Sequence, residues 1–355
     1  MAKITLDQLR HSYLANPRTD ADWALKQLDV AWEDGGAYAL LGPSGCGKTT
    51  LLNIISGLIQ PSQGRVLFDG QDVTNLPPDQ RHIAQVFQFP VIYDTMTVYD
   101  NLAFPLRNRG VAEADVDVRV KQIAELLELT STLRNRASGL TADSKQKISL
   151  GRGLVRSDVN VIMFDEPLTV IDPHLKWQLR SKLKELHREI TRTMIYVTHD
   201  QTEALTIADR VVVMDLGEVV QIGTPVELFE TPQHTFVGHF IGSPGMNVLP
   251  CRLENGRPTI EGLPITTANG DAVRDDGGLL EIGVRPEFIA FADEGLAVDV
   301  VNVSDAGRYR IVETRYGDND VKLLVDEDVE VPAGGAHLRF DPSKTRVYRD
   351  SWLVT

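Results

Sequence analysis

The 355-residue sequence predicts an α/β domain with a mainly parallel sheet over residues 1–240, followed by a small all-β domain over 241–355. In the first part, short apolar runs alternate with amphipathic helical patterns. One of these runs leads into a glycine-rich turn that opens a helix. After about residue 240 the runs become shorter and are separated by Gly, Pro, Asn and Asp, as in a β-sandwich or barrel.

The α/β domain contains three apolar strands whose carboxyl ends carry polar residues. Residues 37–58 predict a strand, a glycine turn and a helix, while 160–167 and 194–200 predict buried strands that end in FDEP and THD. Helical patterns cover 116–129, 144–155 and 174–190. Because ligands bind beyond the carboxyl ends of parallel strands, we expect one pocket to collect the glycine turn, FDEP and THD.

The second domain is indicated by a series of short runs with the composition of β-strands. They are NVLPCRL, LLEIGVR, FIAFA, YRIVETRYG, DVKLLVD and HLRFD. The segment GSPGM at 242–246 is expected to be a linker. This part of the chain is therefore predicted to be a small all-β domain, a sandwich or a barrel.

Composition limits the classes of function. Hydrophobic residues make up 42% and charged residues 24%, as in ordinary soluble proteins. The net charge of −14 gives a nucleic-acid partner no global electrostatic support. Cys46 and Cys251 lie far apart without ligand spacing, and the eight histidines are scattered, so neither a disulfide nor a zinc site is expected.

The sequence carries no pattern for membrane insertion. The first fourteen residues, MAKITLDQLRHSYL, contain charges and lack the apolar centre of a signal peptide. No stretch of about 18 apolar residues occurs, which is the length a membrane-spanning helix needs. We therefore expect a cytosolic or peripheral protein.

The glycine turn matches the phosphate-binding pattern G-x-x-x-x-G-K-[ST]. Its nucleotide-binding residues are predicted to be Gly42, Ser44, Gly45, Cys46, Gly47, Lys48, Thr49 and Thr50. Glycines let the backbone wrap around phosphates, with amide groups and a helix N-terminus directed at the anion. Lys48 is expected to reach the β- and γ-phosphates and Thr49 to ligate Mg²⁺. A chance glycine-rich turn is the alternative, but a strand precedes this turn and a helix follows it.

An acidic pair, Asp165 and Glu166, follows the apolar run VIMF. Acids are common where strands end, so a simple turn is the alternative. Beside a phosphate-binding turn, we predict that Asp165 holds Mg²⁺, usually through water, and that Glu166 polarises the attacking water.

On these motifs the sequence resembles the ATP-binding cassette (ABC) ATPases over nearly its whole length. The resemblance implies ATP and Mg²⁺ as cofactors and makes His199, in THD, a contact of the γ-phosphate. VFQ at 86–88 is similar to the Q-loop, which implies that Gln88 senses Mg²⁺ and touches a transmembrane partner. Asp172 ends PLTVID, a stretch similar to the D-loop.

The same resemblance requires an aromatic ring that stacks on adenine. Tyr13 stands at the matching position. Trp23 is the rival, because the intervening ANPRTDAD looks like an insertion. Simple packing is the alternative for either ring.

Four further stretches resemble the ATPase subunits of carbohydrate and polyol importers, such as the maltose and glycerol types. They are MTVYDNLAFPLR, IGTPVELFETP, FVGHFIGSPGMN and IGVRPEFI. The resemblance implies a helical subdomain at about 90–155, an OB-like regulatory domain at the C-terminus, and a peripheral location on the cytoplasmic side of the inner membrane. It also implies transmembrane permease subunits as partners, a solute-binding protein as an indirect partner, and a polyol or sugar such as glycerol as the solute.

One stretch departs from the family pattern. ABC ATPases close each ATP site with a partner's signature sequence, usually LSGGQ, and counting back from the GR landmark at 151–152 places Leu140, Thr141, Ala142, Asp143 and Ser144 in that slot. Placing ASGLT at 137–141 there instead shifts the helix by three residues. In the preferred register Thr141 caps the helix. The Asp143 carboxylate would lie near a γ-phosphate, where like charges about 4 Å apart repel by about 4 kcal/mol at an effective dielectric near 20.

A homodimer of this chain would therefore contain two impaired sites. We favour a heterodimer with a second ABC ATPase that carries an intact signature. One alternative is a soluble ABC ATPase acting on nucleic acid or ribosomes, which the single cassette and the negative charge oppose. A binding-only regulatory subunit is the other, which Lys48, Asp165 and Glu166 oppose.

Overall fold

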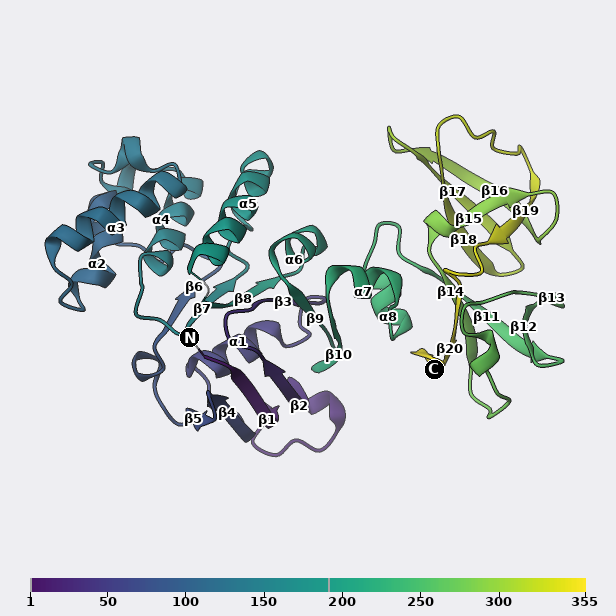
Figure 1. The fold of residues 1–355 in the computed structure, drawn as a ribbon, viewed down its shortest axis with the longest axis horizontal. Helices are drawn as coiled ribbons and strands as arrows, with labels where there is room; N and C mark the ends of the chain where they lie inside the picture. Colours follow the sequence, from purple (N-terminus) through teal and green to yellow (C-terminus); the bar gives the residue numbers. More distant parts are fainter. Residues whose placement is uncertain (1, 191) are drawn as a thin grey trace. The chain divides into compact units, whose positions relative to one another are not determined.

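The computed structural model describes residues 2–190 and 192–355, which form two compact units that meet between Pro225 and Val226 (Figure 1). The first unit is α/β and the second is largely β, so the predicted succession of fold classes is confirmed. In the part of the chain that the structure describes, no helix combines the length and the apolar character needed to cross a bilayer.

The first unit is built on a six-stranded sheet with the order β10-β9-β3-β8-β7-β6. Its strands are β3 (Ala37–Leu41), β6 (Ile83–Val86), β7 (Val161–Asp165), β8 (Thr193–Thr198), β9 (Arg210–Asp215) and β10 (Glu218–Gly223). The strands from β9 to β6 run parallel, and β10 pairs antiparallel at the edge. The three strands predicted from sequence, β3, β7 and β8, are neighbours, so their polar carboxyl ends lie along one edge.

A second, antiparallel sheet was not predicted from the sequence. It has the order β2-β1-β4-β5 and consists of β1 (Ile4–His11), β2 (Leu25–Trp32), β4 (Gln63–Phe68) and β5 (Gln71–Asp72). Helix α1 (Lys48–Ser56) lies between the two sheets (Figure 1), because its buried side chains share one core with residues of both. The helix that follows the glycine turn is thereby fixed on two sides.

The remaining helices of this unit surround the other face of the large sheet. They are α2 (Val98–Arg107), α3 (Glu113–Leu126), α4 (Ala142–Leu154), α5 (Pro173–Ile190) and α6 (Gln201–Ile207). Helices α2, α3 and α4 follow β6 and precede β7, and they gather at one side of the unit (Figure 1). Apolar residues such as Leu102, Val120 and Ile148 join these helices to the sheet in one core.

The second unit contains two sheets whose described pairings are antiparallel. One has the order β13-β12-β11-β14-β20-β21, formed by β11 (Asn247–Glu254), β12 (Arg257–Ile260), β13 (Leu263–Pro264), β14 (Leu280–Val284), β20 (Arg346–Arg349) and β21 (Trp352–Leu353). The other has the order β15-β19-β16-β17-β18, formed by β15 (Ile289–Ala292), β16 (Leu296–Asp305), β17 (Arg310–Tyr316), β18 (Asn319–Val325) and β19 (Gly335–Phe340). All the runs predicted as strands in this region are strands, and β12, β13, β16, β20 and β21 are additional.

Short helices α7 (Pro225–Glu230) and α8 (Thr235–Phe240) precede these sheets, and one buried cation joins them to the β structure. Arg285, after β14, is 3% exposed. Its guanidinium donates hydrogen bonds to the carbonyl oxygens of Phe229 (2.6 Å), Gly238 (3.3 Å) and Ile241. Burial lowers the pKa of Arg285 to about 10. The segment 242–246, predicted as a linker, connects α8 to β11 inside this unit.

Candidate nucleotide site

The glycine turn connects the end of β3 to the first residue of α1, where two glycines are required for different reasons. Gly47 has φ 101°, in the left-handed region, and a Cβ there would lie 2.7 Å from the carbonyl oxygen of Ala24. A Cβ on Gly42 would lie 2.2 Å from the carbonyl oxygen of Met214. The sequence pattern therefore reflects a backbone path that a side chain would block.

Lys48 is the first residue of α1 and is 6% exposed. Its ammonium group donates hydrogen bonds to the carbonyl oxygens of Gly42 (2.8 Å) and Pro43 (2.9 Å). The loop thus curls around a positive charge at a helix N-terminus, an arrangement suited to binding phosphate. Cys46, a residue of the loop itself, is buried, and burial raises the pKa of its thiol.

Thr49 and Asp165 bring a hydroxyl and a carboxylate together from two elements. Thr49 Oγ1, in the first turn of α1, donates a hydrogen bond of 3.2 Å to Asp165 Oδ1 at the end of β7. Burial raises the pKa of the Asp165 carboxyl, the charge of Glu166 adds to this, and the Thr49 hydrogen bond opposes it. Hard oxygen ligands of this kind fit Mg²⁺, which binds through one or two carboxylates together with substrate phosphates.

Glu166 is the point where three strand ends meet. Its backbone has φ 46°, and its N–H donates to the carbonyl oxygen of Val197 in β8 at 2.9 Å. Oε1 lies 3.1 Å from His199 Nδ1, after β8, and Oε2 accepts a hydrogen bond of 3.3 Å from Gln88 Nε2, after β6. Three residues that were singled out from separate motifs therefore surround one carboxylate.

The two aromatic candidates differ in what already contacts them. Tyr13 is 65% exposed, and its hydroxyl lies 3.1 Å from Thr50 Oγ1 in α1. Trp23 is stacked against the guanidinium of Arg10, whose central carbon lies 3.6 Å from the ring centroid. The Tyr13 ring makes an edge contact with the His11 ring, with 4.7 Å between centroids, and lies beside the helix that carries Lys48.

Helix α4 begins at Ala142, directly after Thr141. Thr141 is the N-cap residue, and its Oγ1 accepts a hydrogen bond from the Ser144 N–H at 3.3 Å, which confirms the predicted cap. Asp143 lies in the first turn, and its Oδ2 is 3.8 Å from Lys147 Nζ one turn later. The polar contacts of Thr141 and Asp143 are therefore with residues of their own helix.

Lys147 also lies 3.7 Å from a carboxylate oxygen of Glu128, at the end of α3. The Asp143 carboxylate is 26% exposed and has a cation beside it. The repulsion that it would exert on an incoming phosphate is accordingly smaller than the value for an unpaired charge.

Two further polar residues lie near the site: Gln146 was not predicted from the sequence, whereas Thr169 lies within the predicted D-loop. Gln146 is fully buried in α4, and its Nε2 donates to the carbonyl oxygens of Pro167 (2.8 Å) and Phe87 (3.3 Å). Thr169 Oγ1 donates to the Glu166 carbonyl oxygen at 3.1 Å. Gln146 could have been found in the sequence as a polar residue on the apolar face of the helical pattern 144–155.

The predicted D-loop, PLTVID at 167–172, contains Thr169 and leads directly into α5. Asp172 Oδ1 accepts a hydrogen bond of 2.9 Å from the His174 N–H, so this carboxylate begins the helix. Gln146 therefore joins α4 to the backbone at Pro167, next to Glu166, and at Phe87, next to Gln88.

Comparison with known proteins agrees with this geometry. Residues 25–169 match the sequence profile described as ABC transporter. The protein of Cupriavidus necator named sn-glycerol-3-phosphate import ATP-binding protein UgpC is 38% identical over 347 residues, covering 94% of this chain and 93% of the relative. The chain belongs to the ABC transporter ATPase family. The Escherichia coli protein of the same name is 39% identical over 317 residues, covering 88% of each chain.

Among solved structures, cbiO1 of Clostridium perfringens, described as part of the ABC transporter complex cbiONQ, is similar to this ABC ATPase. The TM-score is 0.57 with 27% identity, over 64% of this chain and 90% of the other. The chain is therefore an ATP-binding ABC ATPase with a further all-β unit, and the predicted family and enzyme class are confirmed.

Proposed function

We propose that this ABC ATPase energises the import of a polyol or sugar, with glycerol and its phosphate ester as the first candidates. It would act from the cytoplasmic face of the inner membrane, attached to permease subunits. A solute-binding protein would deliver the solute to these permease subunits. It would pair with a second ATPase that carries an intact signature sequence.

The arrangement around Glu166 carries the hydrolytic part of this proposal. Lys48 and the loop amides bind the β- and γ-phosphates, and Thr49 and Asp165 hold Mg²⁺, which neutralises charge on the phosphates. Glu166 accepts a proton from the attacking water, as a general base must. Gln88 and His199 orient the Glu166 carboxylate from either side, at 3.3 Å and 3.1 Å, and His199 contacts the γ-phosphate.

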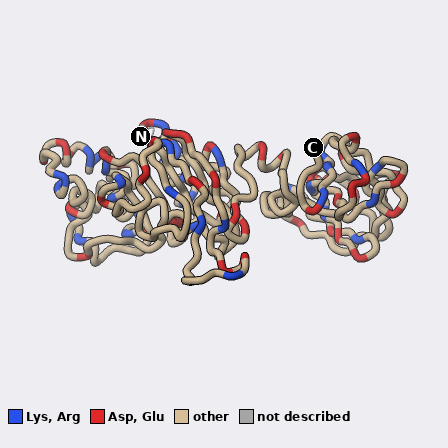
Figure 2. The backbone as a smooth tube through the Cα atoms, turned by 90° about the horizontal axis from the view of Figure 1, so that it is seen from below, with Lys and Arg blue, Asp and Glu red and all other residues tan. Residues whose placement is uncertain are grey.

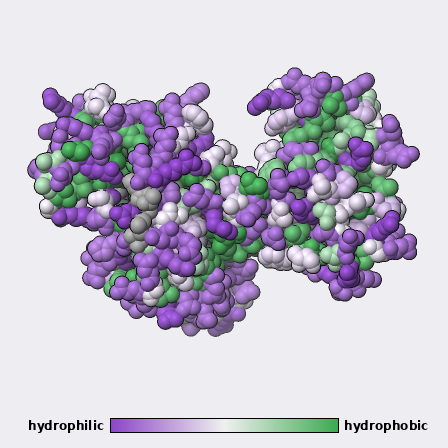
Figure 3. All heavy atoms as spheres, in the orientation of Figure 1, coloured by the Kyte–Doolittle hydropathy of each residue, from purple (hydrophilic) through white to green (hydrophobic). Residues whose placement is uncertain are grey.

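Exposed apolar side chains next to Gln88 support a membrane-protein partner. Phe89 is 71% exposed, and Phe87, Val91 and Tyr93 are also exposed. A groove of about 310 Å³ beside them is lined by Phe87, Val91 and Phe104, with Arg152. Hydrophobic surface also emerges over the helices α2 to α4 in Figure 3. Apolar patches of this kind mark protein-binding sites, and this one lies against the predicted Q-loop.

Charge distribution favours a protein partner over a nucleic acid. Figure 2 shows positive and negative residues intermixed along the backbone of both units. With a net charge of −14, such mixing gives a phosphate backbone little to bind. The names of the relatives, which are glycerol-3-phosphate import proteins, point to the same class of transporter.

The pairing with a second ATPase rests on the start of α4. A signature that closes on ATP needs backbone amides and a hydroxyl free to meet the γ-phosphate. Here the Thr141 hydroxyl is used as a cap and Asp143 adds a carboxylate. A partner with an LSGGQ-like stretch would complete the site that contains Glu166, whereas the opposite site would be weak.

The test is recovery of the intact assembly from native membranes through a tag on this chain, followed by identification of every partner. We expect permease subunits and a second ABC ATPase. The reconstituted complex should hydrolyse ATP faster with glycerol, glycerol 3-phosphate or a sugar and the matching binding protein. Recovery of ribosomes or nucleic acid without membrane proteins would overturn the importer, and a fully active homodimer would overturn the pairing.

A further inference from the structure

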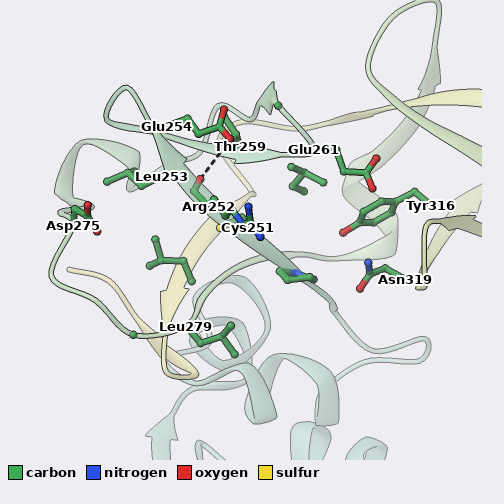
Figure 4. Close-up of a pocket in the computed structure, with 15 residues that line it drawn as sticks. Cys251, Arg252, Leu253, Glu254, Thr259, Glu261, Asp275, Leu279, Tyr316 and Asn319 are labelled. Carbon is green, nitrogen blue, oxygen red and sulfur yellow. Dashed lines mark hydrogen bonds between the residues drawn. The ribbon is translucent and has the colours of Figure 1, made fainter.

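The second unit contains an open pocket of about 930 Å³ that has no part in the nucleotide site (Figure 4). Its walls come from β11 and β12, from the segment 275–280, and from the turn between β17 and β18. Pockets that bind small molecules have volumes of about 300–1,000 Å³ and combine an apolar lining with a few polar groups. The volume alone therefore permits a small ligand.

The lining has an apolar part and a polar part. Leu253, Ile260 and Leu280 belong to or pack against the core of this unit, and they form apolar surface inside the pocket. The exposed polar lining residues are Arg252, Glu254, Glu261 and Asp275, with Asn319 half-buried. A ligand here would meet apolar surface on one side and hydrogen-bonding groups around it.

Tyr316 is the observation that points to a ligand. It is 5% exposed, and its hydroxyl has no hydrogen-bond partner among the described residues. Figure 4 shows this hydroxyl directed into the pocket between Glu261 and Asn319. An unsatisfied buried hydroxyl costs about 1–3 kcal/mol, which a bound polar group would recover. Burial, with the charge of Glu261, raises the pKa of Tyr316 to about 12, so the hydroxyl stays neutral.

The charged side chains around the pocket indicate which ligands it can bind. Within residues 2–190 and 192–355, the carboxylates of Glu254, Glu261 and Asp275 form no ion pair, and neither does the Arg252 guanidinium. Three carboxylates against one guanidinium disfavour a phosphate or another anion. Carboxylates accept hydrogen bonds from hydroxyl groups, while the Asn319 amide and the Tyr316 hydroxyl can both donate and accept.

We propose that this pocket binds a neutral, hydroxyl-rich small molecule, a polyol or a monosaccharide. Its hydroxyl groups pair with Tyr316, Glu261 and Asn319, and its C–H face lies against Leu253 and Ile260. The inference does not depend on the importer assignment, because it rests on the second unit alone.

Calorimetric titration of the full-length chain tests the proposal with glycerol and glucose as neutral probes, glycerol 3-phosphate as the anionic probe and putrescine as the cationic one. We expect at least one neutral probe to bind more tightly than either charged probe. Tyr316→Phe and Glu261→Gln should each weaken that binding about fivefold to tenfold, the effect of one lost hydrogen bond. Tyr309→Phe, at the far end of the β16–β17 hairpin, is the matched control and should bind as the wild type does.

Thermal unfolding separates a ligand-binding role from a structural one. Without ligand, Tyr316→Phe should unfold at the same or a higher temperature than the wild type, because it removes a buried hydroxyl that has no partner. With the neutral ligand the wild type should become the more stable of the two. The proposal is overturned if no neutral probe binds at millimolar concentration, if putrescine binds best, or if Tyr316→Phe leaves the affinity unchanged.

Discussion

The region around Glu166 and the region at the start of α4 contrast in how their polar groups are satisfied. At Glu166, side chains that follow β6, β7 and β8 converge from distant parts of the sequence. At the start of α4, Thr141 and Asp143 contact residues one turn away. The groups around Glu166 are brought together only by the tertiary fold, whereas the contacts of Thr141 and Asp143 chiefly stabilise their own helix. The difference explains why the chain is expected to contribute unequally to two composite ATP sites.

The largest expected effect comes from Glu166→Gln. Loss of the general base should lower steady-state ATP hydrolysis of the purified complex by about 10²–10⁴-fold while ATP still binds. The corresponding Glu→Gln change in the partner ATPase is the matched comparison and should leave substantial turnover. An equal collapse from both changes would show that the two sites contribute alike and would end the asymmetric hypothesis.

Lys48→Ala should have the next largest effect. The ammonium group supplies hydrogen bonds to charged phosphates, each worth about 1.5–3 kcal/mol, so the affinity for Mg-ATP should fall about a hundredfold. Titration calorimetry of the purified chain measures this. Lys121→Ala, on the exposed face of α3, removes the same charge elsewhere and should leave the affinity as it is. An unchanged affinity in a folded Lys48→Ala protein would contradict the phosphate-binding role of the turn.

The adenine ring contact should be weaker. Stacking on an aromatic face is worth about 1 kcal/mol, so Tyr13→Ala should raise the dissociation constant of ATP about fivefold, while Tyr13→Trp is tolerated. Fluorescence titration with a labelled nucleotide measures the change. Trp23→Ala is the control, because Arg10 already covers that ring. Loss of affinity in Trp23→Ala alone would reverse the assignment.

The smallest effect is expected from Asp143→Gly in a complex that already carries Glu166→Gln, so that only the weak site turns over. Removing the carboxylate should raise the residual ATPase rate by about twofold, since Lys147 already compensates part of its charge. Asp143→Glu keeps the charge and serves as the control. A lower rate in Asp143→Gly than in Asp143→Glu would mean that the carboxylate assists this site.

Much of the large sheet was predictable, because β3, β7 and β8 are short, mainly apolar runs that lead into recognisable motifs. The antiparallel sheet could not be predicted, although buried and more exposed residues alternate along most of β1. Its pairing joins Ile4 to Trp32 on one side and to Phe68 on the other, and such distant partners leave no local pattern in the sequence.

The motifs supplied the candidate residues of the site but not all of its contacts. Gln146 contacts Pro167 and Phe87 only because α4 docks against two loops, which spacing within the helix does not reveal. The choice between Tyr13 and Trp23 depended on the position of Arg10. Side-chain competition of this kind exists only in the folded chain.

The hydrogen bonds of the buried Arg285 guanidinium determine where the second unit could be cut for fusion to another protein, in a natural recombination or in an engineered chimaera. Its hydrogen-bond acceptors lie at Phe229, Gly238 and Ile241, before the first β-strand of the unit. A fragment that began at residue 241 would lose α7 and α8, and with them most of the carbonyl oxygens that accept hydrogen bonds from Arg285, which is destabilising. The transferable module is therefore expected to start near residue 226, so that its two short helices and its β-sheets are inherited together.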